Sequence, residues 1–482
     1  MSLTLREKCA QMILAEYRFE SPDYDGSIAL AKEGVGGFCL FGGTIFDVAP
    51  IVNGLHRHAK TPLLFASDFE NGAGQQVQGA TLLPSNMAVG ATRNPELARK
   101  KGAVTAAEAV ALGVRWVFAP VLDLNTNPDN PVINTRSFGS DPALTSKLAR
   151  GFLEGVRSKG AIGCGKHFPG HGGVASDSHV ELPIVKATAE SLKAGELRPY
   201  VELGRDLDAV MTAHLLVPAL DPQSPASLSK SITEGLLRKD LGFEGLVVTD
   251  ALSMGAIAQN VREEEAVVLA AAAGADVILL PKNPGQAIGA LETAVKSGRL
   301  SEETVARASE RILAAKKRLG LLENARVDAG AVERLVGTEA HRAVAQEIAE
   351  ESIAVERGEG VAAGSVFYVK VVDTESVPGD TTIFEKHLTT GIGRMVIGVF
   401  FRPRAYGRRA SLPDHMVKRI QASLKQDPEA VVVSFGSPYL LRPLPEAKHF
   451  VCAWSECEAS QRAAAWAVQG KIPFRGRLPI QL

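Results

Sequence analysis

The sequence predicts a (β/α)8 TIM-type barrel followed by a second, C-terminal α/β sandwich domain. Short apolar segments alternate with helical segments through the first two-thirds of the chain, and a shorter series of alternating elements follows a long helical stretch. The length of 482 residues also exceeds that of one ordinary domain. We place the boundary near residue 335, which gives a barrel domain over 1–335 and an α/β domain over 336–482.

The eight expected barrel strands are short, and each is apolar or bounded by glycine, as buried parallel strands are. They are Met12–Tyr17, Gly37–Phe41, Leu63–Asp68, Trp116–Leu122, Ala161–Lys166, Ala209–Ala213, Gly245–Thr249 and Asp276–Leu280. The helices expected between them include Pro95–Leu112, Leu144–Lys159, Thr188–Arg205 and Ile232–Leu241. Eight strands with intervening helices are typical of this barrel.

The second domain is expected to follow a helical stretch from about Glu302 to Glu351 that is interrupted near Asn324–Ala329. Its expected strands are Ser352–Val355, Val366–Val371, Met395–Phe401, Ala430–Phe435 and Phe450–Trp454.

Composition limits the classes of partner. A formal net charge of −1 gives no electrostatic reason to expect a nucleic acid or an anionic membrane surface. No apolar run reaches the roughly 20 residues that a membrane helix needs, and the N-terminus has no signal-peptide pattern, so we expect a cytoplasmic protein without a membrane partner. The five scattered cysteines are expected to be reduced thiols in the core.

Polar residues follow several of the expected strands directly. They are Asp68 with Glu70, Asp123 with Asn125, Lys166 with His167, Thr212 with His214, and Thr249 with Asp250. The active sites of such barrels lie at the C-terminal ends of the strands, where a polar side chain has left the packed interior and can face a ligand. This repeated pattern predicts a polar site at that end of the barrel.

The densest polar cluster is the segment KHFPGHGGVASDSH, from Lys166 to His179. Its glycines predict a sharply turned loop over the barrel mouth. Asp177 stands two residues from His179, and a carboxylate bonded to one ring nitrogen fixes the tautomer of an imidazole for acid–base chemistry. A polar surface loop or a metal site are the alternatives, and the cationic Lys166 disfavours the metal.

Asp250 follows the expected strand Gly245–Thr249 directly. A carboxylate there is costly unless it is solvated or paired. It can cap the helix that follows or attack an anomeric carbon as a nucleophile. Spacing alone leaves both interpretations open.

At these residues the sequence resembles glycoside hydrolase family 3, and in particular its NagZ-type β-N-acetylglucosaminidases. The pairing of KHFPGHG with DSH carries the resemblance, together with NTRSFGSDP, MTAHLLVPALD and the segment that ends in GLVVTDALSM. GSPYLL and GRLPIQL resemble the C-terminal domain of that family, so the similarity covers nearly the whole chain.

The resemblance implies a role for each of seven residues. Asp250 matches the nucleophile of a retaining mechanism, and His179 with Asp177 matches the acid/base dyad. Those that match sugar-binding residues are Asp68, Arg136, Lys166 and His167. The implied reaction removes terminal β-linked N-acetylglucosamine, with no metal and no cofactor. The implied partner is a small or oligosaccharide substrate that contains this sugar, as in cell-wall recycling.

One departure from the family pattern concerns the segment after Asp68. The family usually has EGGRV there, whereas this chain has the longer, arginine-free run from Glu70 to Val77. The contribution that the arginine of EGGRV makes to the pocket in the family is therefore not expected in this chain. A phosphorylase, another family 3 β-glycosidase and a catalytically silent sugar-binding protein are the alternative functions.

Overall fold

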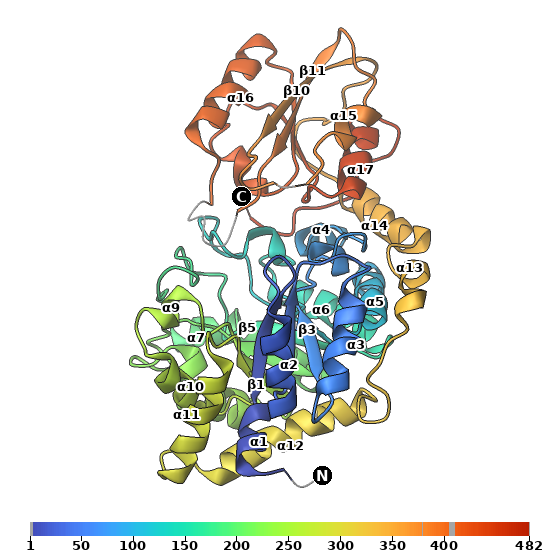
Figure 1. Ribbon diagram of the computed structural model, residues 1–482. Coiled ribbons are helices and arrows are strands. Elements are labelled where there is room, and N and C mark those ends of the chain that lie inside the picture. The colour runs from blue at the N-terminus through green and yellow to red at the C-terminus, as the bar shows by residue number, and fades with distance from the viewer. Residues whose placement is uncertain (1–2, 378, 404–409, 482) are drawn as a thin grey trace.

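The computed structural model describes residues 3–377, 379–403 and 410–481, which form two units joined by helices (Figure 1). The first unit is a barrel of eight parallel strands, and it confirms the predicted fold class. Neighbouring strands follow the order β7-β6-β5-β4-β3-β2-β1-β8, and a parallel bridge between Val248 and Val277 brings β7 and β8 together. The strands are β1 (Ile13–Arg18), β2 (Gly37–Phe41), β3 (Leu64–Ser67), β4 (Trp116–Val117), β5 (Ile162–Phe168), β6 (Ala209–Thr212), β7 (Leu246–Thr249) and β8 (Ile278–Leu279).

Helices surround this barrel, and α5 (Pro95–Leu112) has the bounds that the sequence predicts. The Asn94 side chain accepts the backbone N–H of Glu96, Pro95 occupies the first turn, and Gly113 ends the helix at a φ of 90°. The other helices are α1 (Leu5–Gln11), α2 (Tyr24–Glu33), α3 (Val48–His58), α4 (Asn86–Thr92), α6 (Pro142–Arg157), α7 (Ala189–Ala194), α8 (Arg198–Leu203), α9 (Gly255–Ala258), α10 (Glu263–Ala273), α11 (Pro284–Lys296) and α12 (Glu302–Arg318). Short 3-10 turns cover Ala73–Gln75, Asn134–Arg136, Gly204–Asp206 and Ala226–Leu228, and a π-helix covers Ser231–Asp240.

One predicted helix is wrong in its extent. The expected continuous helix Thr188–Arg205 is instead divided into α7 and α8 at Gly195. Pro199 lacks the N–H that would bond the Gly195 carbonyl four residues earlier, and its ring would clash with that carbonyl. Glycine in a helix interior also costs conformational entropy, so the break falls where the helix is weakest.

The second unit is a five-stranded sheet with helices on both faces, as predicted. The strand order is β10-β11-β12-β13-β9, with β9 antiparallel to β13. The strands are β9 (Ala354–Arg357), β10 (Val366–Val372), β11 (Arg394–Phe400), β12 (Val431–Ser434) and β13 (His449–Cys452). The helices between the barrel and this sheet, and around the sheet, are α13 (Val332–Leu335), α14 (Glu339–Ser352), α15 (Ile383–His387), α16 (Asp414–Gln426) and α17 (Glu458–Val468), with 3-10 turns at Ala329–Ala331 and Pro438–Leu441.

Two hydrophobic clusters form the core of the second unit, one on each face of its sheet. Residues of α14, α15 and α17 fill one cluster, and residues of α16 fill the other. Met87, Ala88 and Ala91 of α4 belong to the second cluster, although α4 precedes α5 in the barrel part of the chain. The two units are therefore packed together through α4. The predicted boundary near residue 335 falls at the end of α13 and stays a prediction.

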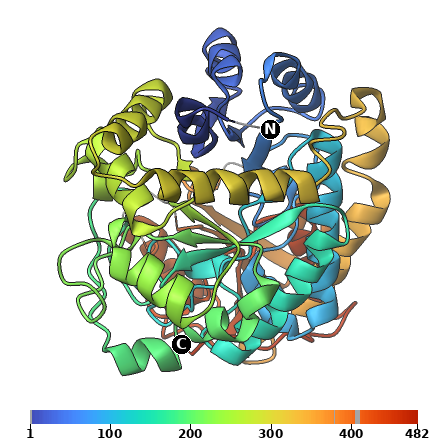
Figure 2. The same cartoon turned by 90° about the horizontal axis from the view of Figure 1, so that it is seen from below.

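The end of the barrel that points away from the second unit is covered by α12, which lies across it in the view from below (Figure 2). Lys316 of α12 is fully buried there, and its Nζ donates to Gln11 Oε1 at 2.7 Å. The C-terminal ends of the barrel strands face the second unit instead (Figure 1). No helix within the described ranges is both long and apolar enough to cross a membrane.

Candidate active site

A cavity of about 430 Å³ lies at the C-terminal ends of the barrel strands. Its lining includes six of the seven predicted site residues, namely Asp68, Arg136, Lys166, His167, His179 and Asp250. The seventh, Asp177, is buried and contacts His179. The second unit adds Arg402 and Pro403 to the lining. The structure therefore brings the predicted residues together, while their roles stay predictions.

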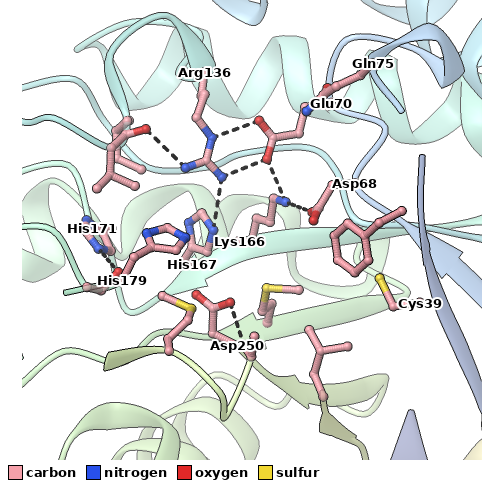
Figure 3. A pocket seen from close by; sticks show the side chains of 18 of the residues that line it. Cys39, Asp68, Glu70, Gln75, Arg136, Lys166, His167, His171, His179 and Asp250 are labelled. Carbon is pink, nitrogen blue, oxygen red and sulfur yellow. Dashed lines mark hydrogen bonds and ion pairs between the residues drawn. The ribbon is translucent and has the colours of Figure 1, made fainter. Parts of the chain in front are cut away.

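One side of the cavity holds a network of paired charges (Figure 3). Lys166, at the end of β5, places its Nζ 2.7 Å from Asp68 Oδ1 and 2.7 Å from Glu70 Oε1. Arg136 donates to the same Glu70 carboxylate through Nε at 3.0 Å and Nη2 at 2.8 Å. Glu70 thus bridges two cations, and Asp68, which is about one-third exposed, is the carboxylate that a ligand can reach.

These pairs fix the charge of each group. Burial opposes ionisation of Glu70, but Arg136 and Lys166 outweigh it and hold the pKa of that carboxyl well below its ordinary value. Burial likewise opposes the charge on Lys166, but Asp68 and Glu70 raise the pKa of its ammonium group above the usual value. Glu70 and Lys166 are therefore both charged at neutral pH, and a ligand meets fixed donors and acceptors.

Asp123, which follows β4, binds both the end of β5 and the loop that follows this strand. Its carboxylate accepts the backbone N–H groups of His167, at 3.1 Å, and of His171, at 2.7 Å. It also contacts His167 Nδ1 at 2.7 Å, which leaves His167 Nε2 turned toward Arg136 Nη2 at 3.4 Å. A fully buried carboxylate with these partners stays ionised, because the nearby imidazole and N–H groups lower its pKa against the effect of burial.

Asp250 lies on the floor of the cavity, directly after β7 (Figure 3). Its Oδ1 accepts the backbone N–H of Ala251 at 2.8 Å. Desolvation in the cavity opposes its charge, but the imidazoles of His167, His214 and His179 outweigh that effect and lower its pKa to about 2. The ionised carboxylate is the form that a nucleophile needs.

His214 holds the chain beside Asp250. It is fully buried, with Nδ1 2.7 Å from Ser227 Oγ and Nε2 2.9 Å from the backbone oxygen of Ala251. His214 therefore contacts the carbonyl of Ala251, the residue whose backbone N–H binds the Asp250 carboxylate.

The opposite side of the cavity carries the Asp177–His179 pair. Asp177 Oδ1 accepts the backbone N–H of His179 at 2.9 Å and lies 2.7 Å from its Nδ1, so one oxygen fixes both the turn and the ring. His171 Nε2 contacts Ser178 Oγ at 2.9 Å and ties this turn to the segment after β5. Burial lowers the pKa of His171 to about 4, so it is neutral at physiological pH.

The predicted sharp loop between these residues depends on two glycines. Gly170 has a φ of 131°, which residues with a side chain rarely adopt. A Cβ at Gly172 would lie 1.6 Å from the backbone oxygen of Leu124, so the close approach requires glycine. The loop therefore returns to the cavity and carries His179 over Asp250.

Several residues of the site have no predicted role. Glu70, Asp123 and His214 are polar residues that follow expected strands, and His171 lies in the polar segment from Lys166 to His179, but the sequence assigns no contact to them. The arginine-free segment places Gln75 in the cavity lining, where its Oε1 accepts the backbone N–H of Asn71 at 2.8 Å. Within the described ranges no group of three or more His, Cys, Asp or Glu residues is arranged to hold a metal ion.

A parallel barrel that places carboxylates, a carboxylate–imidazole pair and fixed cations around one cavity has the groups that nucleophilic and acid–base catalysis need. Residues 4–315 match the family described as "Glycosyl hydrolase family 3 N terminal domain". Because this match covers more than half of the chain, the protein belongs to glycoside hydrolase family 3, and it is an enzyme of that family, as the resemblance implies.

Relatives of known name match the full length. The Cellulomonas fimi protein named "Beta-N-acetylglucosaminidase/beta-glucosidase" is 28% identical over 98% of this chain and 93% of its own. A family 3 β-N-acetylglucosaminidase from Paenibacillus sp. str. FPU-7 has a TM-score of 0.88 and 32% identity, with 100% of this chain and 99% of that one covered. The β-glucoside phosphorylase BglX has a TM-score of 0.91 and 25% identity, with 100% and 94% covered.

Proposed function

We propose that this enzyme is a retaining β-N-acetylglucosaminidase that removes terminal β-linked N-acetylglucosamine through a covalent glycosyl-enzyme intermediate. The observation that carries the proposal is the pairing, in one cavity, of an ionised Asp250 with the Asp177–His179 dyad. The names of the Cellulomonas fimi and Paenibacillus relatives support the choice of sugar.

In the first step, Asp250 attacks C1 of the bound sugar as the glycosidic C1–O bond breaks. The electron pair of that bond leaves with the oxygen, which takes a proton from His179. In the second step, neutral His179 takes a proton from water, the water oxygen bonds to C1, and Asp250 departs as a carboxylate. The sugar is released with retained configuration.

The sugar is held on the charged side of the cavity. Asp68 accepts hydrogen bonds from hydroxyl groups, and the cations of Arg136 and Lys166 donate to hydroxyl oxygens, with His167 beside them. These groups are already paired with each other, so they do not reorganise when the sugar binds. That pre-organisation reduces the free-energy cost of binding the sugar.

Phosphorolysis is a second candidate, because two observations favour it. A carboxylate base would repel a phosphate dianion by about 8 kcal/mol at 4 Å and an effective dielectric constant of 20, whereas a neutral imidazole base does not. The likeness to the phosphorylase BglX points the same way. We favour hydrolysis, because water is always present and the sequence has no phosphate-binding motif.

A panel of aryl β-glycosides, each assayed with and without millimolar phosphate, tests the proposal. We expect the N-acetylglucosaminide to be cleaved with the highest kcat/KM, and free N-acetylglucosamine to be the main product in phosphate. N-acetylglucosamine 1-phosphate as the main product would replace hydrolysis by phosphorolysis. A preference for the glucoside would overturn the choice of sugar. Adding muropeptides, chitin fragments and glycoconjugates to the panel tests which of them is the natural substrate. Preferential cleavage of muropeptides would support a role in cell-wall recycling.

A further inference from the structure

Lys101 is a buried cation directly behind the charged side of the cavity. It lies on α5, with no exposed surface. Its Nζ donates to Asn86 Oδ1 at 2.7 Å, to the backbone oxygen of Pro84 at 2.8 Å and to Asn71 Oδ1 at 3.3 Å. Three acceptors need three N–H groups, which only the protonated ammonium form provides.

Two of these acceptors lead to different parts of the sugar-binding network. Asn71 follows Glu70 in the chain and itself lines the cavity. Asn86 donates from Nδ2 to the backbone oxygen of Arg136 at 2.8 Å. Lys101 therefore joins the segment that carries Glu70 to the turn that carries Arg136. The side chains of Glu70 and Arg136 form the bidentate ion pair of the cavity wall.

The third acceptor leads to the second unit. Pro84 precedes Ser85, whose Oγ donates to the backbone oxygen of Trp454 at 3.0 Å and whose side chain caps α4. Asn86 is the first residue of α4, and α4 contributes to a core of the second unit. The same lysine thus lies where the cavity wall meets the second unit.

A buried lysine is costly, and the cost has to be offset by specific contacts. Burial lowers the pKa of Lys101 to about 7, while the negative charge of Glu70 acts to raise it. Lys316 provides a matched case at the other end of the barrel, because burial also lowers its pKa to about 7. Lys316 donates to Gln11, which is not part of the cavity lining.

We propose that Lys101 is a positioning residue for sugar binding. By holding Asn71 and Asn86, it fixes the separation between the Glu70 segment and the Arg136 turn, and so keeps Arg136 and Lys166 at the spacing that the sugar hydroxyls require. It touches neither Asp250 nor the Asp177–His179 pair, so it acts on the binding of the sugar and not on the bond-breaking step. The identity of that sugar rests on the proposed function.

The test compares Lys101→Met with Lys316→Met in the full-length enzyme. Methionine keeps the length of the side chain and removes its donors. For Lys101→Met we expect KM for the aryl N-acetylglucosaminide, and the dissociation constant of free N-acetylglucosamine, to rise about 10-fold, as the loss of hydrogen bonds to a charged group predicts. The value of kcat should change less than about 3-fold, as expected for an interaction made equally in the ground and transition states. Lys316→Met should change the melting temperature only.

A Lys101→Met enzyme with unchanged KM and a lowered melting temperature would overturn the proposal, since the lysine would then be purely structural. An equal rise in KM for both variants would also overturn it. If Lys101→Met does not fold, Asn86→Ala breaks the link from Lys101 to Arg136 and leaves the Lys101 contacts with Pro84 and Asn71. It should raise KM in the same direction, so an unchanged KM there is decisive against the proposal. If the panel shows that another glycoside is the substrate, the same comparison is made with that glycoside, so the two proposals can fail separately.

Discussion

The two sides of the cavity are held in place in different ways. On the sugar-binding side, Glu70, Arg136 and Lys166 come from separate segments and are locked by ion pairs across the barrel, with Lys101 behind them. On the acid/base side, Asp177 and His179 are two residues apart and form their contact within one turn. The first side depends on the whole fold, whereas the second depends on a glycine-containing loop placed over the cavity.

This difference in how the two sides are held suits their proposed tasks, which are recognition of sugar hydroxyls and acid–base catalysis. Hydroxyl recognition needs several donors and acceptors at fixed spacing, and buried ion pairs hold them without reorganisation. A general acid that later acts as a base has to exchange protons with the leaving group and with water. His179 is accordingly the more accessible partner of its pair, with 20% of its side chain exposed against 2% for Asp177.

The largest expected effect is at Asp250, where the two sides meet. Asp250→Ala should lower kcat at least about 10³-fold, because no covalent intermediate can form. Since the pKa of Asp250 is about 2, its carboxylate is ionised across the neutral range and should not produce the acid limb of the kcat/KM profile. A 2-fluoro sugar should label Asp250, as mass spectrometry of the trapped enzyme can show. Substantial turnover by the alanine variant would exclude Asp250 as the nucleophile.

A change on the acid/base side should depend on the leaving group. His179→Ala should slow cleavage of a poor alkyl leaving group by about 10²–10⁴-fold, but a good aryl leaving group much less, because it needs little protonation. Asp177→Asn should give a milder form of the same pattern. Equal slowing of both substrates would show that His179 is not the general acid.

A change on the sugar-binding side should instead lower the unfolding free energy of the whole protein. Glu70→Gln leaves Arg136 and Lys166 without their shared counter-charge, and breaking such a buried pair costs about 3 kcal/mol or more of unfolding free energy. Urea unfolding measures this loss. Glu429→Gln is the matched control, because Glu429 pairs with Lys448 on the exposed surface and such pairs contribute little. Equal stability of both variants would mean that the network does not hold this side together.

Local pattern alone determined much of this protein. Apolar segments of strand length, each followed by polar residues, predicted both the barrel and the end at which the cavity lies. The Asp177–His179 contact was also predictable, because two residues in one turn are held close by the chain itself. The expected helix Thr188–Arg205 failed where a glycine and a proline together overrode a helical pattern.

Only the tertiary structure decided how the sugar-binding side is built. Glu70 meets Arg136 across 66 residues of chain, and Lys166 meets Asp68 across 98. Lys101 stands beside Lys100 on a helix, yet Lys100 pairs with Glu347 near the surface while Lys101 is fully buried. Sequence periodicity cannot separate two adjacent lysines of this kind, because what buries one of them is the packing of α4 and the second unit against the barrel. That packing is a property of the assembled chain, and it sets the spacing of the charges that face the substrate.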